Sequence, residues 1–324
     1  MESIGGYFSL DLSDKKSSLL ADGVWLNTGR NALEYILLAL GDVRRLFIPY
    51  YTCEAILEPL HRLGIPFSYY HIDWQLEIEK QGELAEGEYL LYTNYFGIKD
   101  EYISSLTAYY GKRLIVDNAQ ALFSTPTKCA GTLYSFRKFV GVPDGGVAIS
   151  DNGHVLEFVV DLSYSRCTHL LKRVEMGAGA GYEDFQKIES ELSAQPIKRM
   201  SLLTQQLIGN IDFELIKKRR LANFNYLHTL LGATNQFYNN LTVDETKDSC
   251  PMVYPYYVED DDLRSHLITN RIFVATYWPN VFQWCDSEDK EYRLAKYCLP
   301  LPIDQRYGEK EMKKIVNTIN NYRR

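Results

Sequence analysis

Short apolar runs alternate with longer segments of helical periodicity through the first half of the chain. Continuous short apolar runs are typical of buried strands, and apolar residues three and four positions apart are typical of one face of a helix. Thr28-Gly29 marks a helix start, and Gly64 and Gly111 mark helix ends. The pattern predicts helices at 31–40, 54–63 and 103–110, and strands at 45–49, 67–72, 89–93, 114–117, 132–135 and 146–150.

Repeated strand–helix–strand units predict an α/β fold with a large, mostly parallel sheet and helices on both of its faces. In such sheets, ligands bind at the carboxyl ends of the strands. Polar residues follow predicted strands at 94–97, 117–120 and 135–138. We therefore expect these segments to meet at one edge of the sheet.

The second half of the chain has longer helical segments and fewer strands. It predicts helices at 154–171, 184–207, 211–231, 261–270 and 309–322, and strands at 253–258 and 272–277. The long amphipathic helix at 211–231 is expected to lead out of the large domain. We therefore expect a large cofactor-binding domain at 1–210, followed at 211–324 by the linking helix and a small C-terminal α/β domain.

Candidate chemistry lies between residues 116 and 146. Asp117 ends an apolar run and Gln120 follows it, whereas Ser135 stands three residues before Lys138. A lysine amine forms a Schiff base with the aldehyde of pyridoxal phosphate (PLP), and a carboxylate keeps the ring nitrogen protonated. The residues therefore predict that Lys138 and Asp117 hold PLP. Ser135 is expected to bind the phosphate, and Gln120 to face the ring hydroxyl or the reacting amine.

Each of these residues also has a simpler interpretation. Taken alone, Lys138 would be a surface lysine, Ser135 a hydroxyl that caps a turn, and Asp117 a helix N-cap. A buried acid at a strand end needs a cation, however, and the nearby Gln120 favours the cofactor role. A reactive lysine must be partly desolvated, and the aromatic and apolar run around Lys138 predicts that it is.

Two further segments are candidates for the cofactor site. Thr28 and Gly29 open a helix, where backbone N–H groups and the helix dipole favour a phosphate. Arg30 either adds a positive charge there or is a solvated surface residue. Tyr51 or Cys53, after the next strand, is expected to lie against the ring face. Tyr51 would stack better than Cys53, but it is also a candidate core residue.

Composition narrows the class of protein. The chain has 324 residues, of which 46% are hydrophobic and 24% charged, and its net charge of −7 argues against a nucleic-acid partner. No apolar run approaches the roughly 20 residues of a membrane helix, and the N-terminus lacks the pattern of a secretory signal. The six cysteines show no Cys-x-x-Cys spacing. This predicts reduced thiols in a cytoplasmic protein, without a disulfide framework or a metal site.

Taken together, these segments resemble the DegT/StrS-like family of sugar-nucleotide aminotransferases, over about residues 26–322. The more specific motifs are Asp117-Asn118-Ala119-Gln120, and Ser135-Phe136 with Lys138 and Asp144-Gly145-Gly146. The supporting segments are Asn27-Thr28-Gly29-Arg30-Asn31-Ala32-Leu33, Pro49-Tyr50-Tyr51-Thr52-Cys53, Asn94-Tyr95-Phe96-Gly97 and Leu299-Pro300-Leu301-Pro302.

The resemblance implies fold type I of the PLP-dependent transferases, which is the aspartate aminotransferase-like fold. It implies that Lys138 carries PLP and is the base that moves a proton between the substrate and cofactor carbons. The implied substrates are an amino donor such as glutamate and a keto-sugar nucleotide, in cell-surface polysaccharide or lipopolysaccharide synthesis. The implied assembly is a homodimer with active sites at the subunit interface.

The chain departs from the family pattern in its site motifs. Ser135 and Lys138 are three residues apart where the family has five, Cys53 aligns with the ring-stacking aromatic, and 181–184 lacks the asparagine expected there. Three alternatives therefore stay open. They are another PLP-dependent reaction (amino-acid transamination or sugar dehydration), a non-catalytic regulatory protein on the same scaffold, and an unrelated nucleotide-binding α/β domain. The absence of a Gly-x-Gly-x-x-Gly motif and of a P-loop weakens the last one.

Overall fold

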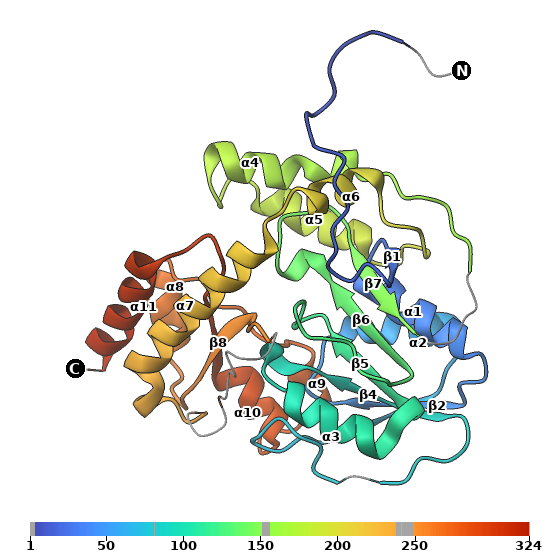
Figure 1. The fold of residues 1–324 in the computed structure, drawn as a ribbon. Coiled ribbons are helices and arrows are strands. Elements are labelled where there is room, and N and C mark those ends of the chain that lie inside the picture. Colours follow the sequence, from blue (N-terminus) through green and yellow to red (C-terminus); the bar gives the residue numbers. More distant parts are fainter. Residues whose placement is uncertain (1–3, 81, 151–155, 238–240, 242–248, 324) are drawn as a thin grey trace.

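A seven-stranded sheet forms the centre of the larger part of the molecule (Figure 1). The computed structural model describes residues 4–80, 82–150, 156–237, 241 and 249–323. The strands lie in the order β1-β7-β6-β5-β4-β2-β3. They are β1 (Val24–Leu26), β2 (Arg45–Pro49), β3 (Phe67–Tyr70), β4 (Glu88–Thr93), β5 (Leu114–Asn118), β6 (Gly131–Ser135) and β7 (Gly146–Ile149).

The sheet is mostly parallel, as predicted. β2 pairs in parallel with β3 and β4, β4 with β5, and β5 with β6. Within the described residues of this sheet, only β7 runs against its neighbours, β6 and β1. All strands of this sheet except β1 were predicted to within two residues at each end. β1 is three residues long, which is too short to carry a periodic signal.

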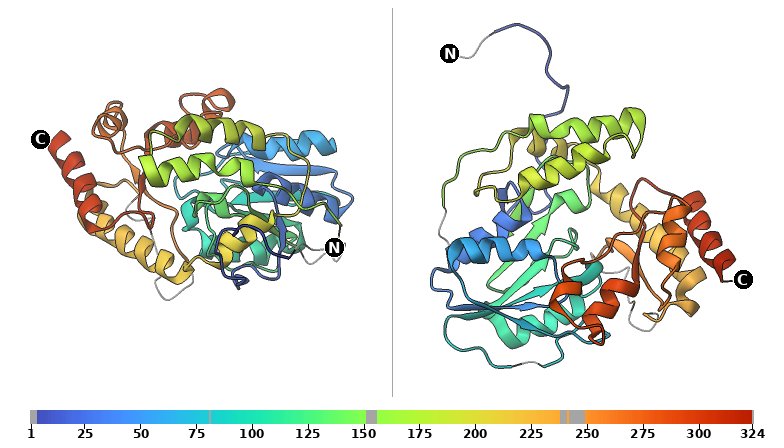
Figure 2. Two further views of the ribbon diagram at one scale, coloured as in Figure 1. Left: turned by 90° about the horizontal axis from the view of Figure 1, so that it is seen from above. Right: turned by 180° about the vertical axis from the view of Figure 1, so that it is seen from behind.

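Helices cover both faces of the sheet (Figure 2). α1 (Gly29–Leu40) and α2 (Leu57–Leu63) pack on one face, and α3 (Asp100–Tyr110) packs on the other. Successive strand residues alternate between the two cores, because side chains of a strand point to opposite faces. In β4, for example, Leu91 packs with α1 and α2, whereas Leu90 and Tyr92 pack with α3.

The C-terminal part of the chain contains a second, smaller sheet. α7 (Phe213–Leu231) leads to it from the large sheet (Figure 1). β8 (Val253–Tyr257) and β9 (Cys298–Pro302) pair there in antiparallel register. The predicted helices of this part are confirmed as α7, α8 (Leu263–Thr269) and α11 (Glu309–Tyr322), within two residues at each end. The short helices α9 (Val281–Trp284) and α10 (Lys290–Tyr297) were not predicted.

Two of the predicted long helices are wrong. Of 154–171, residues 154 and 155 lie outside the described part, 156–163 are not helical, and a short turn leads into α4 (Thr168–Met176). The segment 184–207 is divided into α5 (Tyr182–Leu192) and α6 (Leu202–Gly209). Pro196 cannot continue a helix, and backbone hydrogen bonds tie the segment after it to the chain around β1.

The predicted strand at 272–277 is also wrong, because no ladder forms there. Its side chains do alternate, since Ile272 and Val274 are buried and Phe273 is exposed. The backbone of β8 is paired instead with β9. β9 was not predicted, because its two prolines weaken the strand signal in its sequence.

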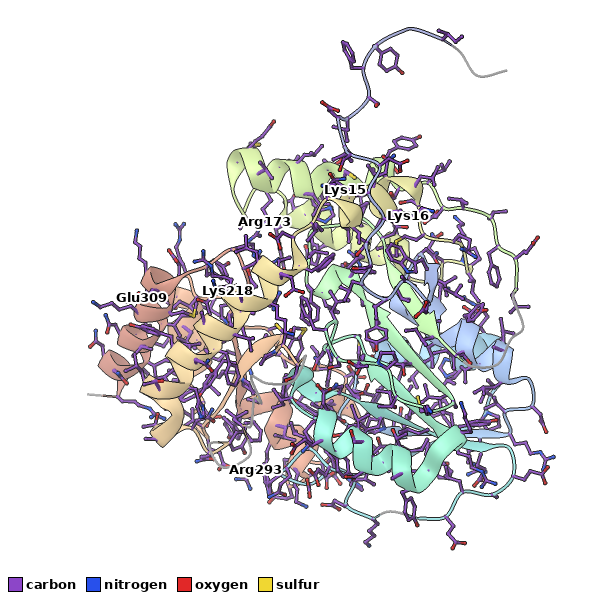
Figure 3. The ribbon with its side chains drawn as sticks, viewed as in Figure 1. Lys15, Lys16, Arg173, Lys218, Arg293 and Glu309 are labelled. Atoms are coloured by element: carbon purple, nitrogen blue, oxygen red, sulfur yellow. The ribbon has the colours of Figure 1, made fainter. Side chains whose placement is uncertain are left out.

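Charged side chains are exposed on several elements, among them Arg173 on α4, Lys218 on α7 and Glu309 at the start of α11 (Figure 3). In the described ranges, no helix has the length and apolar character that a membrane crossing needs. All six cysteines lie in the described part of the chain, and their thiols are free.

Candidate functional site

The carboxyl ends of β4, β5 and β6 lie side by side, and candidate residues follow each of them. β4 pairs with β5, and β5 with β6, in parallel register. The Asn94 N–H donates a hydrogen bond to the Asp117 carbonyl at 2.9 Å, which joins the turn after β4 to the end of β5. The structure therefore brings 94–97, 117–120 and 135–138 to one edge of the sheet, as expected.

Asp117 is a buried carboxylate at this edge. The residue is 7% exposed, and its Oδ1 accepts a hydrogen bond from the Ala119 N–H at 2.8 Å. Burial raises the pKa of Asp117 to about 6, against smaller lowering effects of the Ala119 N–H and of the Lys138 ammonium. Since burial disfavours a charge that lacks a full partner, this carboxylate is suited to accept a cationic N–H.

Lys138 ends η4 (Phe136–Lys138), a single 3₁₀ turn that follows β6. Its ammonium lies close enough to Asp117 to lower the pKa of that carboxyl. Its side chain is exposed, so the prediction that the surrounding run desolvates it is wrong for the chain alone. Phe136 and Phe139 turn into the core, where they are 0% and 3% exposed, and they leave Lys138 outside.

The start of α1 lies against the end of β6. A Cβ added to Gly29 would lie 3.6 Å from the Cβ of Ser135 and 4.0 Å from its Oγ. The Thr28 Oγ1 is engaged locally, because it accepts from the Asn31 N–H at 3.1 Å and donates to the Asn31 Oδ1 at 2.6 Å. Thr28 therefore fixes where α1 begins. The free N–H groups of the first turn and the neighbouring Ser135 hydroxyl can hold an anion.

Two glycines after Asp144 allow the start of α1 to come close to β7. A Cβ on Gly146 would lie 2.2 Å from the Thr28 carbonyl oxygen, so a larger residue cannot be placed there without movement of the backbone. The Gly145 N–H donates to the Asn27 carbonyl at 2.7 Å. These glycines therefore allow the N-terminal end of α1 to lie beside Ser135.

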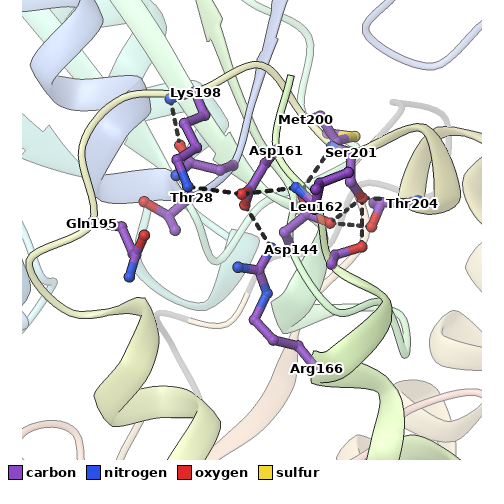
Figure 4. A network of polar contacts seen from close by, with 12 residues as sticks. Thr28, Asp144, Asp161, Leu162, Arg166, Gln195, Lys198, Met200, Ser201 and Thr204 are labelled. Carbon is purple, nitrogen blue, oxygen red and sulfur yellow. Dashed lines mark hydrogen bonds and ion pairs between the residues drawn. The ribbon is translucent and has the colours of Figure 1, made fainter. Parts of the chain in front are cut away.

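Asp144 itself is structural. It is fully buried and accepts hydrogen bonds from the Ser201 N–H, the Ser201 hydroxyl and the Thr204 hydroxyl (Figure 4). Asp161 lies in the same view and is paired with Lys198 at 3.1 Å. These carboxylates fix the segment between α5 and α6 against the sheet. Asp144, the acid of the Asp-Gly-Gly motif, thus has a structural role next to the site.

Gln120 lies within the edge and is 5% exposed. Its Oε1 accepts a hydrogen bond from the Phe96 N–H at 2.8 Å. That bond holds the turn η2 (Tyr95–Gly97), in which Phe96 has a φ of 58°. Gly97 has no room for a Cβ, which would lie 2.9 Å from the Gln120 carbonyl and 3.0 Å from that of Cys250. The carbonyl end of the Gln120 side chain is therefore structural, and its NH2 end is the part suited to a ligand.

Tyr51 is a core residue in this structure. It is fully buried, and its ring packs against Tyr95 and Trp278 with centroid distances of 5.5 and 5.1 Å. No face of the ring is left for a cofactor, which corrects the expectation that Tyr51 stacks on it. Cys53 is half-buried and stays the candidate for the ring face.

α5 supplies a charged neighbour that the sequence analysis missed. Glu189 forms an ion pair with Arg137. Burial raises the pKa of Glu189, but the positive charges of Arg137, Lys138 and Arg30 outweigh it and hold that pKa below its usual value. Arg30 donates to the Leu192 carbonyl at 2.8 Å, so it is directed toward α5 and is not a solvated residue. The sequence analysis placed Glu189 only within the helix predicted at 184–207, whose bounds were incorrect.

These groups fit PLP. Asp117 offers a buried carboxylate to a pyridinium N–H, Lys138 offers an amine to an aldehyde, and the start of α1 with Ser135 offers donors to a phosphate. The short spacing between Ser135 and Lys138 corresponds to one 3₁₀ turn. Ser135 is the extended residue that precedes this turn, and Lys138 is its last residue.

Solved structures share this fold, although no protein-family model and no curated protein matches the sequence. DesV from S. venezuelae, in complex with a ketimine intermediate, has a TM-score of 0.63 and 16% identity, over 93% of this chain and 84% of that chain. A DegT DnrJ EryC1 StrS aminotransferase from Brucella abortus has a TM-score of 0.62 and 16% identity, over 93% and 85%. NtdA from Bacillus subtilis, with bound cofactor PMP, has a TM-score of 0.63 and 15% identity, over 92% and 72%.

The similarity to these structures confirms the predicted fold. It covers nearly all of this chain, and an aminotransferase of the family that the sequence resembles is among the structures that share it. Identities of 15–16% do not carry residue roles from one chain to another. The roles of the site residues therefore rest on the geometry of this chain.

Asp117 should make the stability of the cofactor-free protein depend on pH. Its pKa of about 6 in the folded chain lies above the ordinary value of 3.8. The folded protein therefore binds this proton more tightly than the unfolded chain does, and stability falls as the pH rises from about 4 to about 6. We expect Asp117→Asn to remove this dependence and to raise the free energy of unfolding at neutral pH by about 1–3 kcal/mol.

Urea unfolding of the cofactor-free variants at acidic and neutral pH measures this effect. Asp42→Asn is the matched control, because the Asp42 side chain is 75% exposed and its loss should change neither quantity. If Asp117→Asn were no more stable than the parent protein at neutral pH, other groups would compensate the buried Asp117 carboxylate, and the prediction would be wrong.

Proposed function

We propose that this protein is a PLP-dependent aminotransferase that transfers an amino group to a keto-sugar nucleotide. The observation that carries the proposal is the electrostatic proximity of Lys138 to the buried Asp117, at the sheet edge where α1 begins. PLP, when bound, supplies an electron sink for a substrate carbanion. The remaining tasks fall to side chains of this chain.

Lys138 has two tasks in the proposed reaction. Its amine would hold the cofactor through the aldehyde. The same amine, when free, would be the base that carries a proton between the substrate and cofactor carbons. Asp117 accepts the ring N–H and favours its protonated form, because a cation beside a buried carboxylate removes the cost of that charge.

The other groups bind and orient the cofactor. The first turn of α1, set by Thr28 and Gly29, binds the phosphate together with the Ser135 hydroxyl. The NH2 group of Gln120 donates to the ring hydroxyl or to the reacting amine, since its carbonyl is held by Phe96. Cys53 lies against a ring face.

The substrate class rests on the resemblance of the sequence to sugar-nucleotide aminotransferases and on the names of the proteins that share the fold. We propose an amino donor such as glutamate, a keto-sugar nucleotide as acceptor, and a place in cell-surface polysaccharide or lipopolysaccharide synthesis. Residues 1–210 would bind the cofactor, and residues 211–324 would form the linking helix and the small domain.

We further propose that two copies associate through the face of α4, α5 and the segment that precedes them. Monomeric proteins rarely expose large apolar patches. This face adjoins the candidate site, because Glu189 of α5 is within electrostatic reach of Lys138. A second copy there would reduce the exposure of the site. The exposed apolar residues of the face are Leu162, Tyr164, Leu171, Val174, Met176, Tyr182 and Phe185.

Addition of PLP to the purified protein should give a visible absorption band from cofactor linked to Lys138. Borohydride reduction and peptide mass spectrometry should locate the cofactor on that residue. Lys138→Ala should lack the band, whereas Lys187→Ala, whose side chain is 77% exposed, should retain it. A folded parent protein that stays colourless with PLP would contradict the proposal and favour a non-catalytic scaffold.

Substrate preference separates the proposed reaction from amino-acid transamination. The loaded protein should convert glutamate and then pass the amino group to a keto-sugar nucleotide. We expect kcat/KM for such acceptors to exceed that for small 2-keto acids by at least about tenfold, because the nucleotide adds binding energy in the transition state. Amino transfer to small keto acids alone would be the opposite result.

Charge on the apolar face should weaken association. Val174 is 86% exposed, and burial of a carboxylate in its place at a subunit interface is unfavourable. Val174→Asp should raise the dimer dissociation constant about 30-fold or more, as measured by sedimentation. Leu230→Asp, at a 49% exposed position of α7, is the control and should leave the dimer intact. A monomeric parent protein would refute this arrangement.

A further inference from the structure

Arg220 on α7 is a buried cation that the proposed reaction does not use. The residue is 2% exposed, and it is among the largest fully buried side chains of the described chain. In the described residues, no carboxylate lies within ion-pair distance of its guanidinium. Asp304, which acts on it electrostatically, is paired with Arg306 at 2.6 Å.

The guanidinium is held by oxygen atoms from separate segments. Its Nε donates to the Gln305 Oε1 at 3.1 Å, one terminal nitrogen donates to the Met252 carbonyl at 2.8 Å, and the other donates to the Phe139 carbonyl at 3.3 Å. Its plane also lies over the Phe139 ring, with 4.6 Å from Cζ to the centroid. Gln305 donates to the same Phe139 carbonyl at 2.8 Å.

One side of this arrangement reaches Lys138. Phe139 directly follows Lys138, and its N–H closes the η4 turn by donating to the Phe136 carbonyl at 2.9 Å. The carbonyl of the same residue is held by Arg220 and by Gln305. The orientation of the turn that presents the amine is therefore fixed from the C-terminal part of the chain.

The other side reaches Gln120. The Met252 N–H donates to the Phe96 carbonyl at 2.8 Å, and the Phe96 N–H donates to the Gln120 Oε1 at 2.8 Å. The Met252 carbonyl is the one that Arg220 holds. A continuous set of hydrogen bonds thus connects the Lys138 turn to Gln120 through a single guanidinium.

A buried charge paired only with carbonyls is rarely favoured for stability alone, because an apolar side chain of similar size avoids the desolvation cost. Arginine has a planar fork of donors that can hold several acceptors in fixed directions, and lysine does not. Arg220 lies between the Lys138 turn and the Phe96 turn. A role in fixing the geometry of these turns therefore explains it better than a contribution to stability.

We propose that Arg220, aided by Gln305, is a positioning residue that fixes the Lys138 turn and the Gln120–Phe96 turn relative to each other. Neither residue touches the reacting atoms. This inference rests on the proposed function, in which Lys138 and Gln120 both face the same cofactor.

Hydrogen exchange of the cofactor-free chain tests the positioning role without any activity. We expect Arg220→Met to accelerate exchange about tenfold in both the 95–98 and the 136–140 segments. The second segment loses the hydrogen bond to its Phe139 carbonyl, and the first is held through Met252, whose own carbonyl is released. Gln305→Leu should accelerate only 136–140, since the Gln305 side chain donates to the Phe139 carbonyl, whereas Arg220 still holds the Met252 carbonyl. Arg219→Met, at the exposed neighbouring arginine of α7, is the matched control and should change neither segment.

PLP binding gives the second measurement. Arg220→Met should raise the dissociation constant for PLP, or slow its linkage to Lys138, about 10-fold or more, and Arg220→Lys should not restore it. A parent protein that binds no PLP would refute the proposed function, and the exchange pattern would still decide the positioning role. Folded Arg220→Met with unchanged exchange in both segments would overturn the inference. If Arg220→Met does not fold, unchanged exchange at 136–140 in Gln305→Leu would overturn it.

Discussion

The structure of the site depends on a carboxylate buried at the end of a parallel strand. Both faces of the large sheet are covered, so Asp117 can meet a cation only at the strand edge. One backbone N–H does not satisfy it, and burial holds its pKa near 6. A cationic ring nitrogen would remove this cost. The amine that such a ring needs stands at the end of the next strand, on Lys138.

Arg220 is a buried charge whose surroundings differ from those of Asp117. Asp117 lies at the edge of the sheet with one backbone N–H as its hydrogen-bond donor, whereas Arg220 is surrounded by oxygen atoms that the chain itself supplies. The first arrangement favours binding of a cation and the second favours a fixed geometry. Both residues lie where segments distant in sequence meet. Contacts between such segments determine the positions of the site groups.

Local pattern predicted six of the seven strands of the large sheet, all but the three-residue β1, because most of them are short apolar runs. It also predicted Asp117, Gln120, Ser135 and Lys138 as neighbours, since parallel strands bring their carboxyl ends to one edge. Pattern failed where a partner strand decides the structure. Ile272 and Val274 alternate as a strand should, but among the described residues no strand pairs with 272–277, and β8 pairs with β9.

Contacts across long sequence distances could not be predicted in the same way. Glu189 reaches Arg137 across 52 residues, and Arg220 reaches Phe139 across 81. The exposure of Lys138 was hidden for a related reason. An aromatic run indicates burial of the run as a whole, but the short 3₁₀ turn sends Phe136 and Phe139 inward and the lysine between them outward.

That exposure has a consequence for the assembly of the site. A lysine amine in water stays protonated at neutral pH, so a reactive amine needs either a low-dielectric cover or nearby positive charge. Arg137 is the adjacent cation, but its charge is shared with Glu189. The single chain therefore supplies the buried carboxylate and the amine, and it leaves the amine exposed. The association that we propose through the apolar side chains of α4 and α5 would supply such a cover, since Glu189 of α5 is within electrostatic reach of Lys138.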